Sequence, residues 1–533
     1  MPQREPRGAE ILLGLALAAW ALFPLALLLV HASALHASFT GANGLIGADG
    51  VLGADQLQYL AWIRDASTHG GLASDLFTLS PSGHVYLEPL FALSALLLHA
   101  GLSIQLSYLV LEPLAIVVLA IAVAAWAGRA FPDGAAARAA TVALSLFLCT
   151  PLAALFSWAQ LGAGPFRFQL YLLGDELLAA DKLWGYVPSA IGLALVPASL
   201  LAVERALDPA PGGSHARRQL SHGAPRGRPL LLGVVAALLA SWLHPWQGIT
   251  LVLIFAGLAL GQRLRGWPAL GLCALAAAAP LGYYYLLSHG DPAWQLASHY
   301  EVIPRFPALV LLAGLGPLAL IAAAGVRRPR GSIFEQALLL WIVACFVTYF
   351  VNDSFAPHAL QGLSIPLAVL LVRGGRRLRW GPIVGALAVG LVTVPGLAYD
   401  ARKFVRTARS PLVQYYLTAG DARALAWVAD RAPPGGVLAP TPFAAVVPSR
   451  TGRHVWVGHG YWSDDYPDRA RAADRLFGGR MKRAQARRFV NSTGASILIS
   501  DCAHHHDLSR ALRPILASER RFGCARVYLL RAP

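Results

Sequence analysis

Charge, lysine and methionine are scarce in this sequence of 533 residues. Only 14% of the residues are charged, three are lysine and two are methionine, whereas 56% are hydrophobic. In an ordinary soluble protein about a quarter of the residues carry charge, so this composition excludes that class. Runs of about 18 or more apolar residues recur over the first 400 positions, and each is long enough to cross a bilayer. The sequence therefore predicts a polytopic membrane protein.

Several common motifs are also missing. The chain has no Walker phosphate-binding loop, no dinucleotide-binding glycine fingerprint and no serine nucleophile elbow. It has no visible internal repeat and no low-complexity or acidic tail. The three adjacent histidines at 504–506 are a poor metal site, because neighbouring residues rarely converge on one ion and no Cys/His pair has tetrahedral-site spacing.

The net charge of +16 invites a nucleic-acid partner, but the distribution of arginine argues against one. Much of the arginine lies in short loops between apolar runs, where positive charge sets membrane topology. Of the five cysteines, three lie in apolar segments. Cys502 and Cys524 lie in the polar C-terminal part, where they could pair if it is outside the cell. The sequence does not decide whether they do.

The apolar runs predict about 11–13 transmembrane helices. The first run is too long for a signal-peptide core and lacks a convincing cleavage site, so we interpret it as a retained helix. A chain that starts inside and ends outside must cross the membrane an odd number of times. The twelve apolar runs are an even number, so one of them is misassigned. Either 88–100 is a half-helix or 139–165 holds an extra crossing. The runs are 11–35, 88–100, 105–128, 139–158, 187–204, 230–243, 246–261, 267–286, 307–325, 335–351, 357–372 and 381–399.

The arginine-rich loops place the N-terminus in the cytoplasm and the first large loop, residues 36–87, outside. By the same count residues 287–306, 352–357 and everything after 399 are outside. After Tyr399 the composition changes, and helix-like patterns at 421–431, 468–477 and 481–491 alternate with strand-like runs at 437–440, 454–458, 496–500 and 527–530. We therefore expect a transmembrane domain at 1–399 and a small extracytoplasmic α/β domain at 400–533.

The stretch GADQLQYLAWIRDAS, residues 53–67, places an acid ahead of an aromatic, amphipathic run. Asp55 followed by Gln58 is typical of a helix N-cap, so we expect a helix that begins at Asp55. Tyr59 and Trp62 recur at helical spacing and suit a membrane interface. One interpretation is that Asp55 only caps this helix. The other is that it acts as a general base at the outer membrane face.

One large outer loop with an acid and a juxtamembrane helix, many further helices and an extracytoplasmic C-terminal domain resemble the GT-C superfamily of membrane glycosyltransferases. Within it, DQLQYLAWIRDAS, SDLF, HPWQG and PHALQGLSIPL look like a group of poorly characterised bacterial and archaeal members. The resemblance implies a polyprenyl-phosphate sugar donor, a glycan, lipid or protein acceptor, and the bacterial plasma membrane. By position it assigns the catalytic base to Asp55, with Asp49 as the rival in the same loop.

Displacing a lipid phosphate from a sugar needs positive charge near the departing phosphate. No cofactor is certain; a divalent metal such as Mg²⁺ or Mn²⁺ could supply that charge, as could arginine and histidine. The candidates for the donor phosphate are His244, His299, Arg305 and His358. The candidates for the acceptor or the sugar are Tyr59, Glu301, Asn352, Asp353, Gln361, Tyr461 and Trp462.

Two other functions fit parts of the sequence. A transporter or flippase for a lipid-linked glycan would show polar residues near the membrane midplane and internal repeats. Here the polar candidates gather at one face, and a large outer domain is unusual in a carrier. A structural or binding component would use the C-terminal domain to recognise a glycan or a partner, and would not need Asp55.

Overall fold

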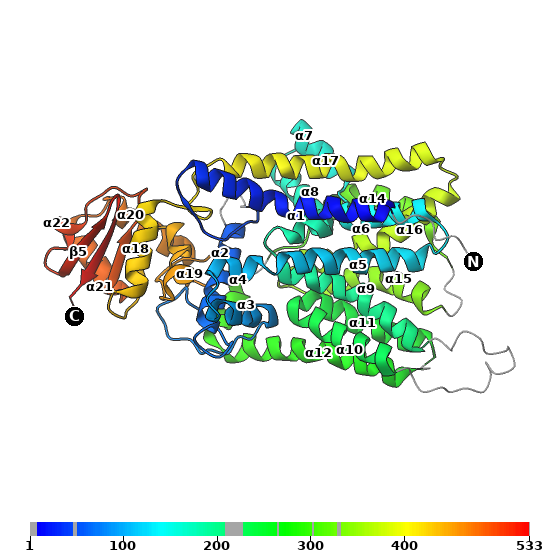
Figure 1. The fold of residues 1–533 in the computed structure, drawn as a ribbon, viewed down its shortest axis with the longest axis horizontal. Coiled ribbons are helices and arrows are strands. Elements are labelled where there is room, and N and C mark those ends of the chain that lie inside the picture. The colour runs from blue at the N-terminus through cyan, green and yellow to red at the C-terminus, as the bar shows by residue number, and fades with distance from the viewer. Residues whose placement is uncertain are drawn as a thin grey trace. The chain divides into compact units, whose positions relative to one another are not determined.

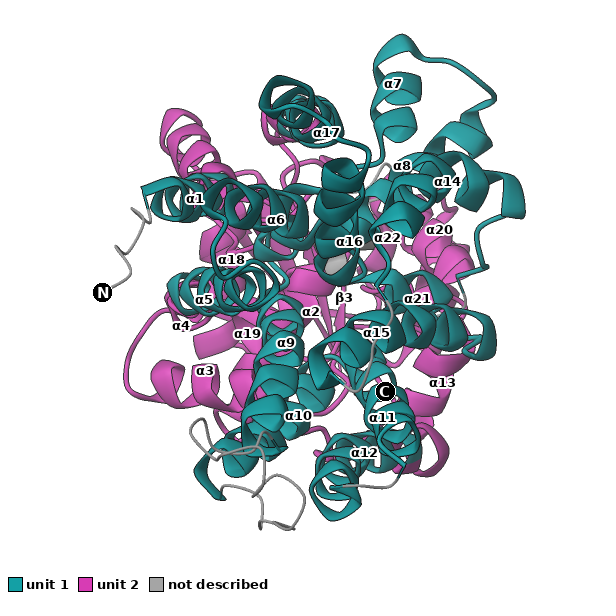
Figure 2. Ribbon diagram, turned by 90° about the vertical axis from the view of Figure 1, so that its right-hand side faces the viewer, with its two compact units in different colours: residues 1–21, 112–285, 302–402 teal, residues 22–111, 286–301, 403–533 magenta. Residues whose placement is uncertain are grey.

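The computed structural model describes residues 8–45, 51–207, 227–263, 266–300, 303–327 and 332–531. The chain divides into two compact units, coloured separately in Figure 2. Unit 1 comprises residues 1–21, 112–285 and 302–402, and unit 2 comprises residues 22–111, 286–301 and 403–533. Residues 36–87 thus belong to the same unit as the C-terminal residues. The domain boundary expected at residues 399 and 400 stays a prediction.

Long apolar helices dominate the structure (Figure 1). Within the described ranges, seven are long and apolar enough to cross a membrane, or eight if one bent pair counts as a single span. These seven are α1 (Gly8–Ala34), α4 and α5 together (Ile104–Ala130), α9 (Val187–Leu207), α12 (Trp267–Gly290), α14 (Ala308–Gly325), α15 (Ile333–Val351) and α17 (Pro382–Ala408). The bent pair is α6 (Ala135–Phe147) and α7 (Pro151–Ala159), which meet at an angle of 52°.

This number is lower than the 11–13 expected because several apolar runs form short helices. These are α3 (Pro89–His99), α10 (Gly227–Leu243) and α11 (Pro245–Gly261). An 11-residue helix such as α3 is only about 16 Å long, roughly half of a bilayer core. The run at 357–372 divides into a 3₁₀ turn, η2 (Ala356–Leu360), and α16 (Ser364–Arg377). The run at 139–158 is broken before Pro151. The short α3 has the length of the half-helix that was one alternative at 88–100, and the break before Pro151 makes α6 and α7 a bent pair that counts as at most one span.

Unit 2 contains a four-stranded sheet with the order β3-β4-β6-β5. β3 (Val437–Leu438) runs parallel to β4 (Ile497–Ser500), and β6 (Ala525–Leu530) is antiparallel to both β4 and β5 (Leu516–Phe522). Alternate residues of a strand face opposite sides of a sheet. Leu498 and Tyr528 are buried on one face, and Ile497, Ile499 and Val527 are buried as well. Both faces of the sheet are therefore covered, as in a small α/β domain.

Helices of unit 2 cover this sheet. α20 (Tyr466–Phe477), α21 (Arg483–Thr493) and α22 (Ser509–Leu512) share a hydrophobic core with Leu498 and Tyr528. α18 (Ala419–Asp430) packs against β5 and β6. β1 (Ser38–Phe39) and β2 (Tyr416–Leu417) pair as a two-stranded sheet and join an N-terminal segment to this part of the chain. α19 (Val447–Thr451) and α13 (Pro292–Tyr300) also belong to this unit.

Cys502 and Cys524 form a disulfide. The pairing that the sequence left open is thus present, close to the start of α18, where the Thr418 hydroxyl lies 3.0 Å from the Cys502 sulfur. The other three cysteines, Cys149, Cys273 and Cys345, are free and buried. This agrees with their expected role as small core residues.

Candidate functional site

Asp55 is held by a histidine from the C-terminal part of unit 2. Asp55 lies on α2 (Val51–Ala66), and its Oδ1 atom is 3.1 Å from Nε2 of His459. The His459 side chain is fully buried, whereas that of Asp55 is 22% exposed. The backbone N–H of Tyr461 donates to Nδ1 of His459 at 3.2 Å. Because Nδ1 accepts, a neutral His459 carries its proton on Nε2 and donates it to the Asp55 carboxylate.

Asp55 is not the N-cap of its helix, contrary to the sequence prediction. The helix begins at Val51, so Asp55 lies in its second turn. The capping pattern failed because the helix continues upstream through an apolar stretch and the Asp55 carboxylate binds His459 instead. The side-chain oxygen of the adjacent Gln56 accepts hydrogen bonds from the backbone N–H groups of Asn43 and Gly44, at 2.8 Å each. These two residues precede the helix in the sequence.

The loop that carries His459 is hydrogen-bonded to, and packs against, Phe77 of the SDLF motif (Ser74–Phe77). The Ser463 hydroxyl accepts the N–H groups of Gly458 and His459 at 3.0 and 3.2 Å and donates to the Phe77 carbonyl at 2.8 Å. The Phe77 ring packs against the His459 ring with centroids 5.5 Å apart. A Cβ atom at Gly458 would lie 2.9 Å from the Phe77 ring, so this contact needs glycine. The loop that carries His459 therefore contacts both Asp55 and the SDLF motif.

Asp75, inside the SDLF motif, is a buried carboxyl group. Its Oδ1 accepts the N–H of Phe77 at 2.8 Å, and its Oδ2 has no hydrogen-bond partner. The pKa of Asp75 is raised to about 8, chiefly by burial and also by the negative charges of Asp464 and Asp291, against the opposing effect of the Phe77 N–H. Asp75 is therefore largely protonated at neutral pH.

The raised pKa predicts how stability depends on pH. The folded state holds the Asp75 proton up to about pH 8, whereas an unfolded chain loses it near pH 4. The stabilising effect is therefore complete below pH 4 and is lost as the pH rises toward 8. Between pH 6 and pH 8 this group alone should cost about 2–3 kcal/mol of unfolding free energy. We expect Asp75→Asn, which mimics the protonated form, to flatten this decline in a thermal-unfolding series. A decline as steep as in wild type would contradict the prediction.

Two predicted sugar-binding residues belong to an aromatic cluster in unit 2. Trp462 is buried, with its ring 5.3 Å from that of Trp62 and 5.0 Å from that of Trp294. The Tyr59 ring lies 5.0 Å from Phe91. Edge and tilted contacts of this kind stabilise the packing of α2. Tyr461, next to His459, is partly exposed.

A second polar cluster lies in unit 1 and joins the HPWQG and PHALQG motifs. Glu176, at the end of α8 (Gly164–Leu177), is buried. Nδ1 of His358 lies 3.1 Å from its Oε1, and the Gln361 amide donates to its Oε2 at 2.7 Å. Lys182, on the 3₁₀ turn η1 (Ala179–Leu183), lies 3.9 Å from Oε2. The ring of His244 lies 5.8 Å from that of His358. The structure thus brings together three residues that the sequence analysis selected separately.

Glu176 and Lys182 in this cluster each stabilise the charged form of the other. Burial alone would raise the pKa of Glu176, but His358 and Lys182 lower it to about 2. Burial alone would lower the pKa of Lys182, but Glu176 and two nearby aspartates raise it. Glu176 and Lys182 are therefore both charged. Burial lowers the pKa of His244 to about 3, so this histidine is neutral. His358, with its side chain 26% exposed, is the member with most access to solvent.

The structure also describes Arg305, Asn352, Asp353 and His299. Arg305 donates hydrogen bonds to the backbone carbonyls of Tyr349, Phe350 and Asn352 and to the Asp353 carboxylate. These bonds satisfy carbonyl groups at the C-terminal end of α15. The Asn352 side chain accepts the N–H of Ser354. His299 is exposed at the end of α13. Asp49 and Glu301 lie outside the described residues.

Sequence reasoning missed His459 and the partners of His358. In the run GHGYWSDDYPDR, the aromatic residues Tyr461 and Trp462 are predicted contacts for the acceptor or the sugar, whereas His459 is not among the predicted residues. The sequence assigns no role to Glu176 or Lys182. A charged residue in an otherwise apolar region is the signal that could have found Glu176, because such residues are often functional. No local signal pairs residue 55 with residue 459.

Several solved structures are similar to this chain. The oligosaccharyltransferase of Archaeoglobus fulgidus in its apo form matches 95% of this chain and 70% of its own, with a TM-score of 0.51 and 12% sequence identity. The chain has the GT-C fold. ArnT from Cupriavidus metallidurans in the apo state matches 95% of this chain and 97% of its own, with a TM-score of 0.47 and 12% identity. ArnT bound to undecaprenyl phosphate matches 96% of this chain and 98% of its own, with a TM-score of 0.46 and 14% identity.

Sequence comparison adds no relative to these. No model of a known protein family matches the chain, and no curated protein is significantly similar to it in sequence. At 12% identity the similarity establishes the GT-C fold alone. The chemistry must therefore be argued from the residues of this chain.

Proposed function

We propose that this protein is a membrane glycosyltransferase that transfers a sugar from a polyprenyl-phosphate donor to an acceptor hydroxyl. The observation that supports it most is the hydrogen bond between Asp55 and the buried His459. A partly exposed carboxylate, oriented by an imidazole nitrogen that donates to it, is suited to accept a proton. The GT-C fold, shared with a known oligosaccharyltransferase, favours glycosyl transfer as the reaction.

The proposed reaction is a direct displacement. Asp55 accepts the proton of the acceptor hydroxyl while that oxygen forms a bond to the anomeric carbon of the sugar. The bond from this carbon to the phosphate oxygen breaks, and the lipid phosphate leaves with the electron pair. Because the acceptor attacks from the face opposite the phosphate, the anomeric configuration inverts. His459 keeps the carboxylate oriented, which is the usual effect of a buried hydrogen-bonding partner.

For the donor phosphate, the proposal favours His358. Its Nδ1 lies 3.1 Å from the Glu176 carboxylate, which orients the ring, and its side chain is 26% exposed, so Nε2 would be the atom available to a phosphate oxygen. His244 is neutral and Arg305 is already bound to four oxygen atoms, so both are weaker candidates. His299 stays a candidate because of its exposed position.

A catalytic Mg²⁺ or Mn²⁺ would supply positive charge beside the departing phosphate. Mg²⁺ is usually held by one or two carboxylates together with substrate phosphates, and Asp55 is the described carboxylate that could take this part. Within the described ranges, the one group of three or more side chains with metal-ligand spacing contains two histidines and does not include Asp55. No step of the proposed reaction is routed through a metal.

The proposed location is the bacterial plasma membrane, with the C-terminal part of the chain outside the cytoplasm. The disulfide between Cys502 and Cys524 supports that orientation, because disulfides persist in oxidising compartments. The acceptor would be a glycan, a lipid or a protein on that side. Tyr461, partly exposed beside His459, is the proposed contact for the acceptor or sugar.

The role of His459 predicts a selective effect on turnover. His459→Ala removes the donor to Asp55 and should lower kcat about 10- to 100-fold with little change in KM, since partners that only orient a reacting group act at this scale. His459→Gln can still present an N–H and should recover most of the activity. Steady-state kinetics of both variants measures the difference. Equal losses in the two, or a loss confined to KM, would contradict the assigned role.

The test of the function uses purified protein in nanodiscs and a panel of polyprenyl-phosphate sugars. The proposal predicts release of free polyprenyl phosphate with at least one donor, and transfer of the sugar when the acceptor is present. Release that persists in a chelator would agree with the metal-free reaction. Movement of lipid-linked sugar across the bilayer with no turnover would favour the transporter instead.

A further inference from the structure

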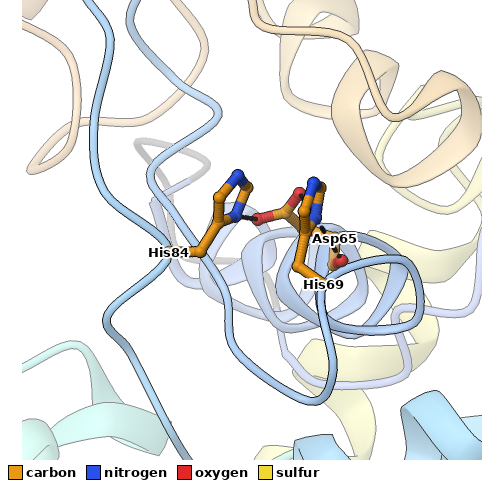
Figure 3. A group of neighbouring side chains, drawn as sticks. All are labelled: Asp65, His69 and His84. Carbon is orange, nitrogen blue, oxygen red and sulfur yellow. Dashed lines mark hydrogen bonds and ion pairs between the residues drawn. The ribbon is translucent and has the colours of Figure 1, made fainter.

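Unit 2 contains a second cluster of polar side chains that the proposed reaction does not use. Figure 3 shows Asp65, in the last turn of α2, with the imidazoles of His69 and His84 turned toward its carboxylate. Nδ1 of His69 lies 3.0 Å from Oδ1 of Asp65. Nδ1 of His84 lies 3.0 Å from Oδ2. Two histidines far apart in the sequence therefore share a single carboxylate.

The two imidazoles are unusually close to one another. Their rings are stacked with centroids 3.6 Å apart and planes inclined by 17°. Nδ1 of His69 is also within 3.1 Å of three oxygens, on Asp65 and Thr68. An oxygen-rich position between two imidazole nitrogens suits a metal cation.

We propose that Asp65, His69 and His84 bind a zinc ion. One ligand atom from each residue lies within 4.8 Å of the others. Zn²⁺ binds histidine nitrogen at about 2.0–2.1 Å and carboxylate oxygen at about 2.0–2.2 Å, so the two 3.0 Å separations are compatible with one ion. Two imidazoles and one carboxylate select zinc over Mg²⁺ or Ca²⁺, which prefer oxygen ligands. A water molecule would complete the tetrahedron.

The carboxylate is already held in position by the chain. Oδ2 of Asp65 accepts both the N–H of Ser74, at 2.7 Å, and its hydroxyl, at 2.9 Å. Asp65 and Ser74 are buried. Hydrogen bonds of this kind orient the ligands of metal sites and raise their affinity. The histidine side chains are 42% and 36% exposed, so an ion can reach them from solvent and the rings can adjust around it.

Zinc at this position would cross-link the end of α2 to residue 84 and restrain the segment between them. That segment contains Asp75 and Phe77, and Phe77 packs against His459. The bound ion would therefore order the residues that support Asp55. The zinc site itself stands apart from the proposed transfer reaction, so its test does not depend on any sugar donor.

The test measures zinc binding to full-length protein in detergent after removal of metals. Zn²⁺ is titrated against a competing fluorescent chelator, and bound zinc is counted by mass spectrometry. We expect one zinc per chain in wild type, at least a tenfold weaker affinity in His84→Ala, and no stoichiometric binding in His69→Ala/His84→Ala. His505→Ala changes an exposed histidine outside the cluster and should leave the affinity unchanged.

Two readouts separate loss of the site from loss of the fold. Zinc should slow hydrogen exchange of residues 68–84 in wild type and not in His84→Ala, while exchange of the C-terminal sheet stays the same in both. Co²⁺ should give a tetrahedral visible spectrum that disappears in the double variant. Wild-type protein that binds no stoichiometric zinc would overturn the proposal. So would equal zinc binding by the double variant, or a loss of binding in His505→Ala.

Discussion

Asp55→Asn should lower the rate of sugar transfer by about 10²- to 10⁴-fold, the range that a general base contributes. Asparagine has nearly the same shape as aspartate and can still accept the hydrogen bond from His459, which is 3.1 Å away in the wild-type protein. It cannot take up a proton. The loss should therefore appear in kcat, with little change in the binding of the lipid donor. Single-turnover kinetics with a saturating donor measures it directly.

Two matched variants make this prediction specific. Asp430→Asn removes an exposed carboxylate at the end of α18 and should leave the rate unchanged. Asp49→Asn tests the rival acid in the same outer loop, which lies outside the described residues. Full activity in Asp55→Asn together with a large loss in Asp49→Asn would move the catalytic base to Asp49.

Glu176→Ala should destabilise the protein by about 3–5 kcal/mol, because removing one partner of a buried ion pair leaves the other charge uncompensated. Glu176 is the acceptor for Gln361 and the partner of His358 and Lys182, and Lys182 is buried. The low pKa of Glu176, about 2, means that its contribution is complete above pH 4.5 and is lost only as the pH falls toward 2. The effect should therefore be present in full at neutral pH.

The control for this prediction is Asp353→Asn, since the Asp353 side chain is 86% exposed and forms its ion pair at the surface. Its cost should be below about 1 kcal/mol. Adding Lys182→Met to Glu176→Ala should restore part of the lost stability, because the double variant no longer buries an unpaired charge. Denaturant unfolding in detergent compares the four proteins. A Glu176→Ala variant within about 1 kcal/mol of wild type would contradict this account of the cluster.

Hydropathy and turn patterns in the sequence predicted the long apolar helices and several helices and strands of the C-terminal part. The long apolar runs became helices, and the helices and strands expected at 421–431, 468–477, 496–500 and 527–530 have counterparts in α18, α20, β4 and β6. β5 (Leu516–Phe522) was missed because its sequence, LASERRF, is polar and it lies at the edge of the sheet, where only one neighbour and little burial are needed. The lengths of the short apolar helices could not be predicted, because hydropathy does not reveal where a helix breaks.

The candidate sites were only partly visible in the sequence. Asp55, His244, His358 and Gln361 were selected from their position at predicted membrane faces. Their partners could not be, because the contacts of residue 55 with residue 459 and of residue 176 with residue 358 depend on tertiary packing. The same holds for the proposed zinc ligands, where residue 84 meets residue 65 only through the intervening loop.

The central claim is that Asp55 is the base of a glycosyl transfer, and one measurement tests it most directly. Wild type and Asp55→Asn are reconstituted side by side in nanodiscs with a turnover-competent polyprenyl-phosphate sugar, and released polyprenyl phosphate, transferred sugar and bound donor are quantified. The account predicts that wild type releases the phosphate and forms a product of inverted configuration, while Asp55→Asn binds the donor equally well and turns it over at least 100-fold more slowly. Equal turnover by the two proteins would contradict it.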